Sequence, residues 1–302
     1  MQKCASASAL AGQQPRALSP LNVRRIDLPM VEAGETLRDA AAGIAADLKA
    51  ALGDRRMPAA RVREVAAQTI LVSGGVRSAA LIDALALSPP QCKALAQAVE
   101  PLCVSVVVYV PARQVFLVNE RARRAGHSAQ PHYVCADAPP TIIPRPPCID
   151  AFARALTSGG SCIFIDAPNA RACGVAVCGW LLEYPYVYVL DAENAPQFTL
   201  VDPPAWVDDW DGTPNALGHV PLCGLTVTLG PLQVLSCTFP CTLADACARL
   251  DSSVHAVHNM LVARLAAEQL ALSSLSPALQ RALAQLSPSV ARFHTVHDRV
   301  AL

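Results

Sequence analysis

The spacing of apolar and polar residues changes repeatedly along the chain, and the clearest succession of patterns covers residues 160–191. Residues 161–165 are a short apolar run between two glycines and an Asp-Ala-Pro-Asn turn, which is typical of a buried strand. Residues 170–182 carry apolar side chains at helical spacing, and 186–190 is rich in β-branched and aromatic residues. This order predicts a right-handed βαβ unit with parallel strands.

Apolar stripes with steps of three and four residues predict helices on both sides of this unit. One such stripe covers residues 35–52 and ends at Gly53, and the longest covers residues 242–272. Shorter helices are expected at residues 59–67, from Ser88-Pro89 onwards, at 149–156, and after Ser276-Pro277 and Ser287-Pro288.

Pairs of β-rich runs separated by short turns predict two antiparallel hairpins. Residues 104–110 and 114–118 flank a Pro-Ala-Arg turn, and residues 222–229 and 232–239 flank a Gly-Pro turn. In residues 222–229 the apolar side chains share one face and the threonines share the other, so one side of this hairpin is expected to be buried.

Two proline-rich stretches are predicted to be long loops. Residues 120–148 contain Arg121, Arg123 and Arg124, which could face an anion, although a solvated surface cluster is the simpler interpretation. Residues 192–217 combine four aspartates with two tryptophans. The spacing there does not fit a calcium-binding EF-hand loop, so we interpret the stretch as a solvated acidic loop.

These elements predict an α/β fold with a mixed sheet, one central parallel βαβ unit, two β-hairpins and covering helices. A single domain is expected over residues 31–272, with short helices over 273–302. Residues 1–30 are interpreted as a disordered or transit-like N-terminus. Residues 1–25 lack acidic side chains, which fits an organellar transit peptide as well as an ordinary disordered end.

Composition narrows the class of protein. The 302 residues are 53% hydrophobic and 16% charged, which is ample for a core, and the net charge of zero argues against nucleic-acid binding. The longest charge-free stretch, residues 212–244, contains several prolines and alternates in period two, so no membrane span is expected. Twelve cysteines without a C-x-x-C pair suit a reducing compartment, cytoplasmic by default, with organellar import as the alternative.

A ligand site is expected where two predicted strands turn into helices. Residues 69–72 are predicted to be a strand that leads through a Ser-Gly-Gly turn into a helix containing Leu81, Ile82 and Leu85. The second turn follows the strand 161–165. Ligands of open α/β sheets bind at the carboxyl ends of strands, where free N–H groups of helix N-termini attract anions. The ligand-binding residues expected at this edge are Ser73, Gly74, Gly75, Asn169 and Arg171.

The residues of both turns could also have a purely structural role. Asp166 or Asn169 can simply cap a helix, and a lone Gly-Gly turn is more often a matter of packing than of ligand binding. The leading expectation is that the protein binds a small ligand or a protein partner of unknown identity at this edge. No cofactor is indicated.

The alternative expectation is a hydrolase or transferase that uses Cys173 or Asp166. A helix N-terminus lowers the pKa of a thiol, which would make Cys173 the nucleophile. His132, His219 or His255 could serve as its base and Asp166 could orient that base, but the sequence brings none of these together.

Two H-x-x-H spacings, His255/His258 and His294/His297, place histidines three residues apart. On a helix each pair would share a face and could hold a metal ion. Neither pair has the H-E-x-x-H form, so surface histidines are the simpler interpretation and no metal ligand is assigned.

The motif Gly-Trp-Leu-Leu at residues 179–182, followed by Tyr184-Pro185 and Val187-Tyr188, resembles a stretch in an uncharacterised eukaryotic family. The human member of that family is the open reading frame 74 protein of chromosome 1. A weaker likeness covers roughly residues 59–244. The motif is aromatic and apolar, so the resemblance implies no catalytic residue and no reaction.

Overall fold

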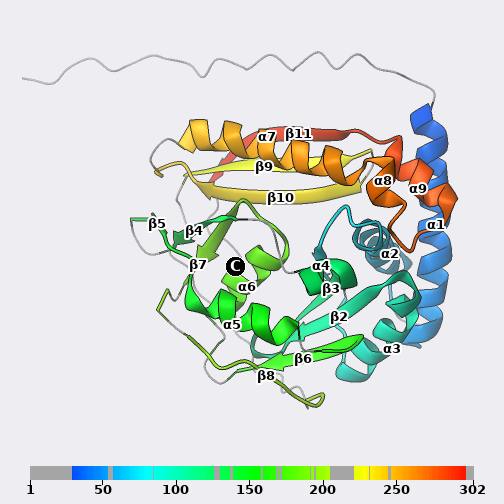
Figure 1. The fold of residues 1–302 in the computed structure, drawn as a ribbon, viewed down its shortest axis with the longest axis horizontal. Coiled ribbons are helices and arrows are strands. Elements are labelled where there is room, and N and C mark those ends of the chain that lie inside the picture. Colours follow the sequence, from blue (N-terminus) through cyan, green and yellow to red (C-terminus); the bar gives the residue numbers. More distant parts are fainter. Residues whose placement is uncertain are drawn as a thin grey trace, which may run out of the picture.

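The computed structural model describes residues 29–296 apart from short gaps. These gaps are residues 54–56, 84, 126–129, 137–138, 158, 168–169, 171, 191, 194, 205–220, 231 and 244–245. The described chain forms three β-sheets with helices between and around them (Figure 1).

The largest sheet, sheet A, has five strands in the order β1-β3-β2-β6-β8. Strand β2 pairs antiparallel with β3 and parallel with β6. All six residues of β2 are buried, as expected for a central strand covered on both faces. The strands are β1 (Ala79–Leu81), β2 (Val104–Tyr109), β3 (Gln114–Asn119), β6 (Cys162–Asp166) and β8 (Thr199–Leu200), with 3-10 turns η1 (Glu100–Leu102) and η2 (Val110–Ala112) at the ends of β2.

Alternate residues of β2 enter two different cores. Val106 and Val108 pack in one hydrophobic cluster with α1 (Pro29–Leu52), α2 (Ala59–Ser73) and α3 (Pro89–Val99). Val107 and Tyr109 face the opposite side and pack with α5 (Pro147–Leu156) and α6 (Cys173–Leu181). Successive side chains of a strand point to opposite faces of the sheet, so β2 packs against a layer of helices on each side.

The other two sheets have three strands each. Sheet B has the order β5-β4-β7, with β5 (Thr141–Ile143), β4 (His132–Cys135) and β7 (Tyr186–Val189). Sheet C has the order β10-β9-β11, with β10 (Leu232–Pro240), β9 (Pro221–Leu229) and β11 (Pro288–Val296). The rings of Tyr186 in β7 and Phe239 in β10 stack with centroids 4.0 Å apart, which joins the two sheets.

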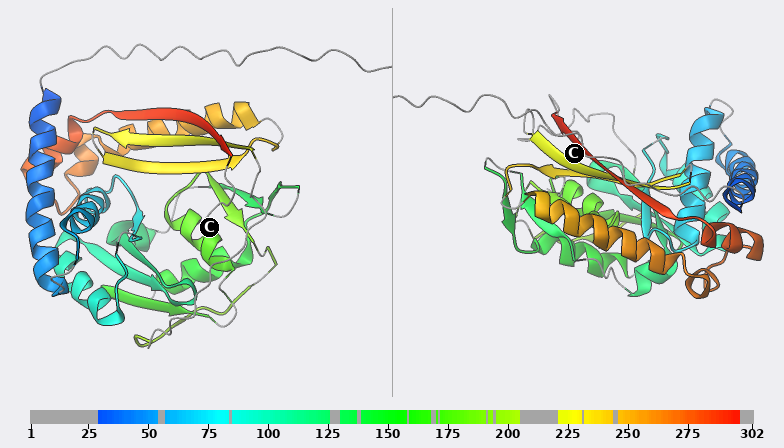
Figure 2. Two further views of the ribbon diagram at one scale, coloured as in Figure 1. Left: turned by 180° about the vertical axis from the view of Figure 1, so that it is seen from behind. Right: turned by 90° about the horizontal axis from the view of Figure 1, so that it is seen from above.

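Helix α7 (Ala246–Arg264) lies along sheet C, and the short α8 (Ala267–Leu270) and α9 (Pro277–Ala284) follow it. Helix α1 contacts α9 as well as α2 and α3, so it runs along the side of both parts of the molecule (Figure 2). The short α4 (Glu120–Ala125) follows β3. No helix in the described ranges is both long and apolar enough to span a bilayer.

The predicted fold class, a mixed α/β architecture with parallel strand pairs and two hairpins, is confirmed. The strand pairing predicted for residues 160–191 is wrong. Strands β6 and β7 flank α6 as expected, but they belong to different sheets: β6 is parallel to β2, and β7 is parallel to β4. The partner of β7 lies within residues 120–148, which were predicted to be a loop but contain α4, β4 and β5.

Three further elements differ from the prediction. Residues 69–72, predicted to be a strand, belong to the C-terminal part of α2, where the Thr69 hydroxyl donates to the Val65 carbonyl at 2.8 Å. Leu81, predicted to lie in a helix, ends strand β1. Pro288 opens strand β11 rather than a helix, a position that proline tolerates because it lacks an N–H. The helix predicted for residues 242–272 is interrupted before α8 at Ala266, whose ψ is 136°.

Candidate functional site

The two predicted turns lie at opposite ends of sheet A. Gly74 caps the C-terminus of α2, and the Ser73 hydroxyl donates to the Leu102 carbonyl at 2.8 Å, close to where β2 begins. Asp166 is the last residue of β6, which runs parallel to β2. The amino ends and the carboxyl ends of parallel strands lie on opposite edges. The structure therefore does not bring Ser73 and Gly74 together with Asp166, and the expected shared edge is absent.

Cys173 is the first residue of α6, as the sequence suggested, but its side chain is only 1% exposed. It belongs to the hydrophobic cluster that contains Tyr109, Phe152 and Trp180. Burial, together with the neighbouring Cys173, raises the pKa of the Tyr109 hydroxyl, which donates to the Ala170 carbonyl. A substrate cannot reach the Cys173 thiol in this conformation.

Of the remaining predicted site residues, the structure describes some and leaves out others. Gly75 has a φ of +71°, a left-handed conformation that glycine adopts without strain, and it follows the C-cap of α2 rather than a strand. Asn169, Arg171 and the candidate base His219 lie outside the described residues.

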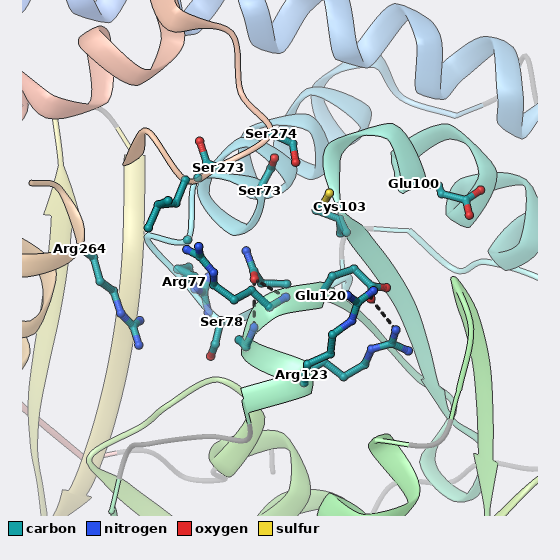
Figure 3. A pocket seen from close by; sticks show the side chains of 18 of the residues that line it. Ser73, Arg77, Ser78, Glu100, Cys103, Glu120, Arg123, Arg264, Ser273 and Ser274 are labelled. Atoms are coloured by element: carbon teal, nitrogen blue, oxygen red, sulfur yellow. Dashed lines mark hydrogen bonds and ion pairs between the residues drawn. The ribbon is translucent and has the colours of Figure 1, made fainter. Parts of the chain in front are cut away.

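A cavity of about 1030 Å³ opens at the edge of sheet A where β2 and β6 begin (Figure 3). It is bounded by the C-terminus of α2, the end of β3, helix α4, the segment before β6 and the α7–α8 region. Serines and glycines make up much of the remaining surface. The charged lining comprises five arginines and three glutamates: Arg77, Arg121, Arg123, Arg124, Arg264, Glu100, Glu120 and Glu183.

Arg123 organises one wall of this cavity. Its Nη1 donates to the carbonyls of Gly159 and Gly160, each at 2.8 Å, and its Nη2 pairs with the Glu120 carboxylate. The residue is 6% exposed, so these bonds satisfy a nearly buried guanidinium and fix α4 against the segment before β6. Arg123 is thus a structural cation whose charge is already matched.

Arg264 organises the opposite wall, across from Cys103 and Glu100 (Figure 3). Its Nη1 and Nη2 donate to the two carboxylate oxygens of Glu183, each at 2.7 Å. Burial lowers the pKa of Arg264, whereas the hydrogen bonds and charge of Glu183 raise it by more, so the pair remains ionised.

Two further arginines of α4, Arg121 and Arg124, line the cavity and face solvent. The Arg124 side chain is 79% exposed and lies 3.4 Å from Glu120, which already pairs with Arg123. Arg121 is exposed, and its guanidinium has no ion-pair partner among the described residues. Two exposed side chains therefore present guanidinium groups that are only weakly matched by carboxylates.

Arg77 contributes to the lining but directs its Nη1 to the Gln68 side chain at 2.8 Å. Gln68 lines a separate hollow of about 310 Å³. Burial lowers the pKa of Arg77, and the charges of Tyr184 and Glu183 oppose that effect. We therefore do not count Arg77 among the groups that point into the larger cavity.

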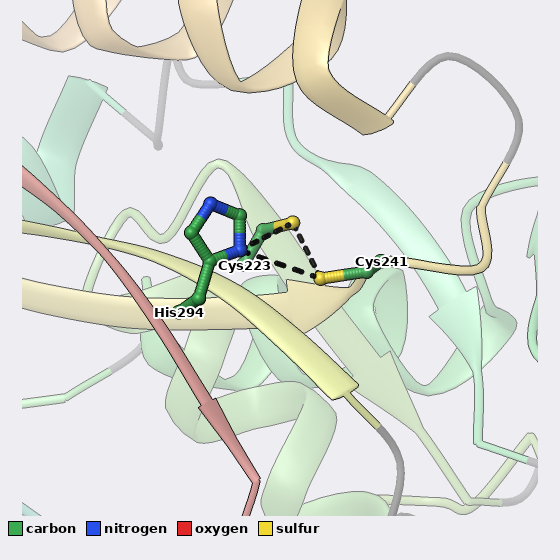
Figure 4. A group of neighbouring side chains, drawn as sticks. All are labelled: Cys223, Cys241 and His294. Carbon is green, nitrogen blue, oxygen red and sulfur yellow. Dashed lines mark hydrogen bonds between the residues drawn. The ribbon is translucent and has the colours of Figure 1, made fainter. Parts of the chain in front are cut away.

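One group of three described side chains could hold a metal ion: Cys223, Cys241 and His294 (Figure 4). Neither H-x-x-H pair forms such a group among the described residues. His255 and His258 lie on α7 and join no such group within the described chain. His294 lies on strand β11 rather than on a helix, and His297 is outside the described residues.

Sequence reasoning missed Arg264, Glu183 and the Cys/His group. Arg264 and Glu183 are 81 positions apart, and no local pattern links them. The Cys/His group could have been found only with a strand at residues 288–296, which the Ser-Pro pair led us to interpret as a helix. The arginines of residues 121–124 were identified from the sequence as candidate anion ligands, but helix α4, which carries them, was not predicted.

No match was found when the chain was compared with family models, with curated proteins and with solved structures. Function is therefore inferred from the geometry of the sites described above.

Proposed function

We propose that the protein binds a small anionic ligand of the phosphate-ester class in the cavity at the amino ends of β2 and β6. The observation that carries this proposal is the pair of exposed guanidinium groups of Arg121 and Arg124 on the rim of a cavity of about 1030 Å³. Guanidinium groups bind phosphate oxygens in pairs of parallel hydrogen bonds.

The surrounding surface supports an oxygen-rich ligand. At Gly75 and Gly160 an added Cβ would meet nothing within 4 Å, so a ligand can approach the backbone there, and Ser273 and Ser274 add hydroxyls from the α8–α9 connection. The fixed ion pairs of Arg123 and Arg264 shape the walls while leaving Arg121 and Arg124 for the ligand. The volume is within the range that accommodates a cofactor-sized or metabolite-sized molecule.

The proposal keeps Ser73, Gly74 and Gly75 as ligand-binding residues and moves the site away from Asp166 and Cys173. The alternative of a hydrolase or transferase using Cys173 has weaker support, because that thiol is buried. The proposed relationship to the uncharacterised eukaryotic family assigns no reaction and leaves this choice unchanged.

Calorimetric titration with inorganic phosphate and pyrophosphate tests the proposal. We expect saturable binding of at least one of the two anions at constant ionic strength. In the double variant Arg121→Gln/Arg124→Gln, binding should weaken at least about tenfold, because each lost charge-assisted bond contributes roughly 1.5–3 kcal/mol.

The matched control removes two other arginines. Arg61 and Arg63 are exposed on α2 and do not line the cavity, so Arg61→Gln/Arg63→Gln changes the net charge equally. The control should bind as the wild type does. Equal weakening in both double variants, or no binding of either anion, would count against the site.

A further inference from the structure

The group formed by Cys223, Cys241 and His294 is assembled by all three strands of sheet C. Cys223 and His294 are directly opposite each other on the antiparallel strands β9 and β11. Cys241 follows the last residue of β10, and its N–H donates to the Pro221 carbonyl at 2.8 Å. Three neighbouring strand ends therefore place one side chain each at the same spot (Figure 4).

The spacing of the three donor atoms can be compared with a tetrahedral site. The His294 Nδ1 lies 3.7 Å from the Cys223 Sγ and 3.8 Å from the Cys241 Sγ. Zinc–sulfur and zinc–nitrogen bonds of about 2.3 and 2.0 Å give a sulfur–nitrogen edge of roughly 3.6 Å in a tetrahedron. The imidazole nitrogen is therefore almost equidistant from both sulfurs at nearly the separation that a shared ion requires.

The two sulfurs are closer than a tetrahedral site needs. The Cys223 Sγ lies 2.6 Å from the Cys241 Sγ, whereas a zinc tetrahedron has a sulfur–sulfur edge of about 3.8 Å. Cys241 is only half-buried and lies in the turn after β10, so rotation of its side chain can open this edge. Cys223 is held within β9 and supplies the fixed end of the site.

We propose that Cys223, Cys241 and His294 bind one zinc-class metal ion, with a fourth position open to water or an external ligand. Two thiolates and one imidazole select zinc or cuprous copper over magnesium or calcium, which prefer oxygen donors. His294 is exposed, so the site is accessible from solvent. On binding, both thiols transfer their protons to the buffer and become thiolates.

The bound ion would link the ends of β9, β10 and β11. A Cys223–Cys241 disulfide is the competing outcome, because the two sulfurs are already near each other. A disulfide gives no role to the imidazole, whereas a metal ion accounts for all three side chains. We therefore favour the metal site and treat the disulfide as a result that the experiment must be able to return.

The test is titration of the fully reduced, metal-free protein with Co²⁺, a spectroscopic substitute for Zn²⁺. We expect one equivalent of Co²⁺ to produce thiolate-to-cobalt charge-transfer absorption and the visible bands of a tetrahedral site. Added Zn²⁺ should abolish these bands, and about two protons should be released per ion. These readouts do not depend on any activity of the protein.

Single variants assign the ligands. Cys241→Ser and His294→Ala should each weaken Co²⁺ binding at least about tenfold and change the charge-transfer band. Cys237→Ser is the matched control, because Cys237 lies on β10 but outside the group, and it should keep the wild-type spectrum. Cys241 is half-buried and His294 is exposed, so both substitutions are compatible with folding even if Cys223→Ser is not.

Three results would overturn the proposal. The first is the absence of tetrahedral bands in the reduced wild-type protein. The second is a spectrum that survives both Cys241→Ser and His294→Ala. The third is a Cys223–Cys241 disulfide, found by mass spectrometry, that forms equally fast with and without saturating Zn²⁺.

Discussion

Arg264, the last residue of α7, forms a two-bond ion pair with Glu183 in the turn after α6, with both N–O distances at 2.7 Å. Glu183 is 9% exposed and has a φ of +57°, so the turn holds its side chain in one direction. The same carboxylate accepts from the Ser78 N–H at 3.4 Å. This pair connects the helix on sheet C to the start of β1 in sheet A and fixes one wall of the cavity.

Substituting Glu183→Gln removes the negative partner and leaves the Arg264 guanidinium largely buried without its counter-charge. Breaking such a pair from one side destabilises a protein by about 3–5 kcal/mol. We expect a loss of free energy of unfolding of that order, measured by denaturant titration. Glu64→Gln is the control: Glu64 is half exposed beside Arg61, and its loss should change stability by less than about 1 kcal/mol. Equal effects of the two substitutions would refute the structural role of the buried pair.

Removing the Tyr109 hydroxyl tests the packing between sheet A and α6. Tyr109 and Ala170 are both fully buried, and the hydroxyl donates to the Ala170 carbonyl. Tyr109→Phe keeps the ring contacts and removes one of the two hydrogen bonds to that carbonyl, which still accepts from the Cys173 N–H at 3.0 Å, so we expect a loss of roughly 0.5–1.5 kcal/mol. A melting temperature equal to that of the wild type would show that another donor replaces the hydroxyl.

Replacing glycine with alanine should lower the free energy of unfolding at Gly224 and raise it at Gly43. A Cβ at Gly224 in β9 would lie 2.3 Å from the Phe293 ring, so Gly224→Ala must displace that ring and costs about 1–3 kcal/mol. A Cβ at Gly43 meets nothing within 4 Å on the exposed face of α1, so Gly43→Ala should stabilise the helix by about 0.5–1 kcal/mol. Parallel urea titrations compare the two, and a stabilising Gly224→Ala would contradict the β9–β11 register.

Cysteine alkylation as a function of pH should separate exposed from buried thiols. Burial raises the pKa of both Cys92 and Cys237 to about 12. Only the thiolate reacts, so at pH 8 about one such thiol in ten thousand is reactive. Cys92 is 0% and Cys237 is 6% exposed, so the raised pKa and the lack of access should both keep these thiols unlabelled near neutral pH while the protein is folded. The exposed Cys103 should be labelled first, and the buried Cys173 should remain protected until the protein unfolds. Rapid labelling of Cys173 at neutral pH would restore it as a candidate nucleophile.

The sequence predicted elements well where one local pattern decides them. The apolar stripe of α1, the alternation of β9 and the short turns between the strands of both hairpins are local signals, and the structure confirms these elements. Residues 69–72 were mispredicted because a fully buried helical turn and a buried strand carry the same apolar composition. In the helix the Thr69 hydroxyl donates to the Val65 carbonyl, so this buried polar side chain has a hydrogen-bond partner.

The site was harder to predict than the elements, because its parts are distant in the chain. The expected pairing of β6 with β7 failed since β7 found a partner in β4, inside a proline-rich stretch without clear strand periodicity. The ligand site was expected at the carboxyl edge because residues 69–72, which belong to α2, were interpreted as a second strand beside β6. The arginines of α4 were visible in the sequence, but only the tertiary structure shows that they share a cavity with Ser73 and Arg264.

The central claim is that an anion occupies this cavity, and the exposed Cys103 thiol that lines it offers a direct measurement. The rate of Cys103 alkylation should be followed by mass spectrometry as pyrophosphate is added at constant ionic strength, with Cys135 on β4, outside the cavity, as internal reference. We predict a saturable decrease at Cys103 that leaves Cys135 unchanged and disappears in Arg121→Gln/Arg124→Gln. A Cys103 rate that does not respond to pyrophosphate, or that falls equally in the double variant, would contradict the proposed site.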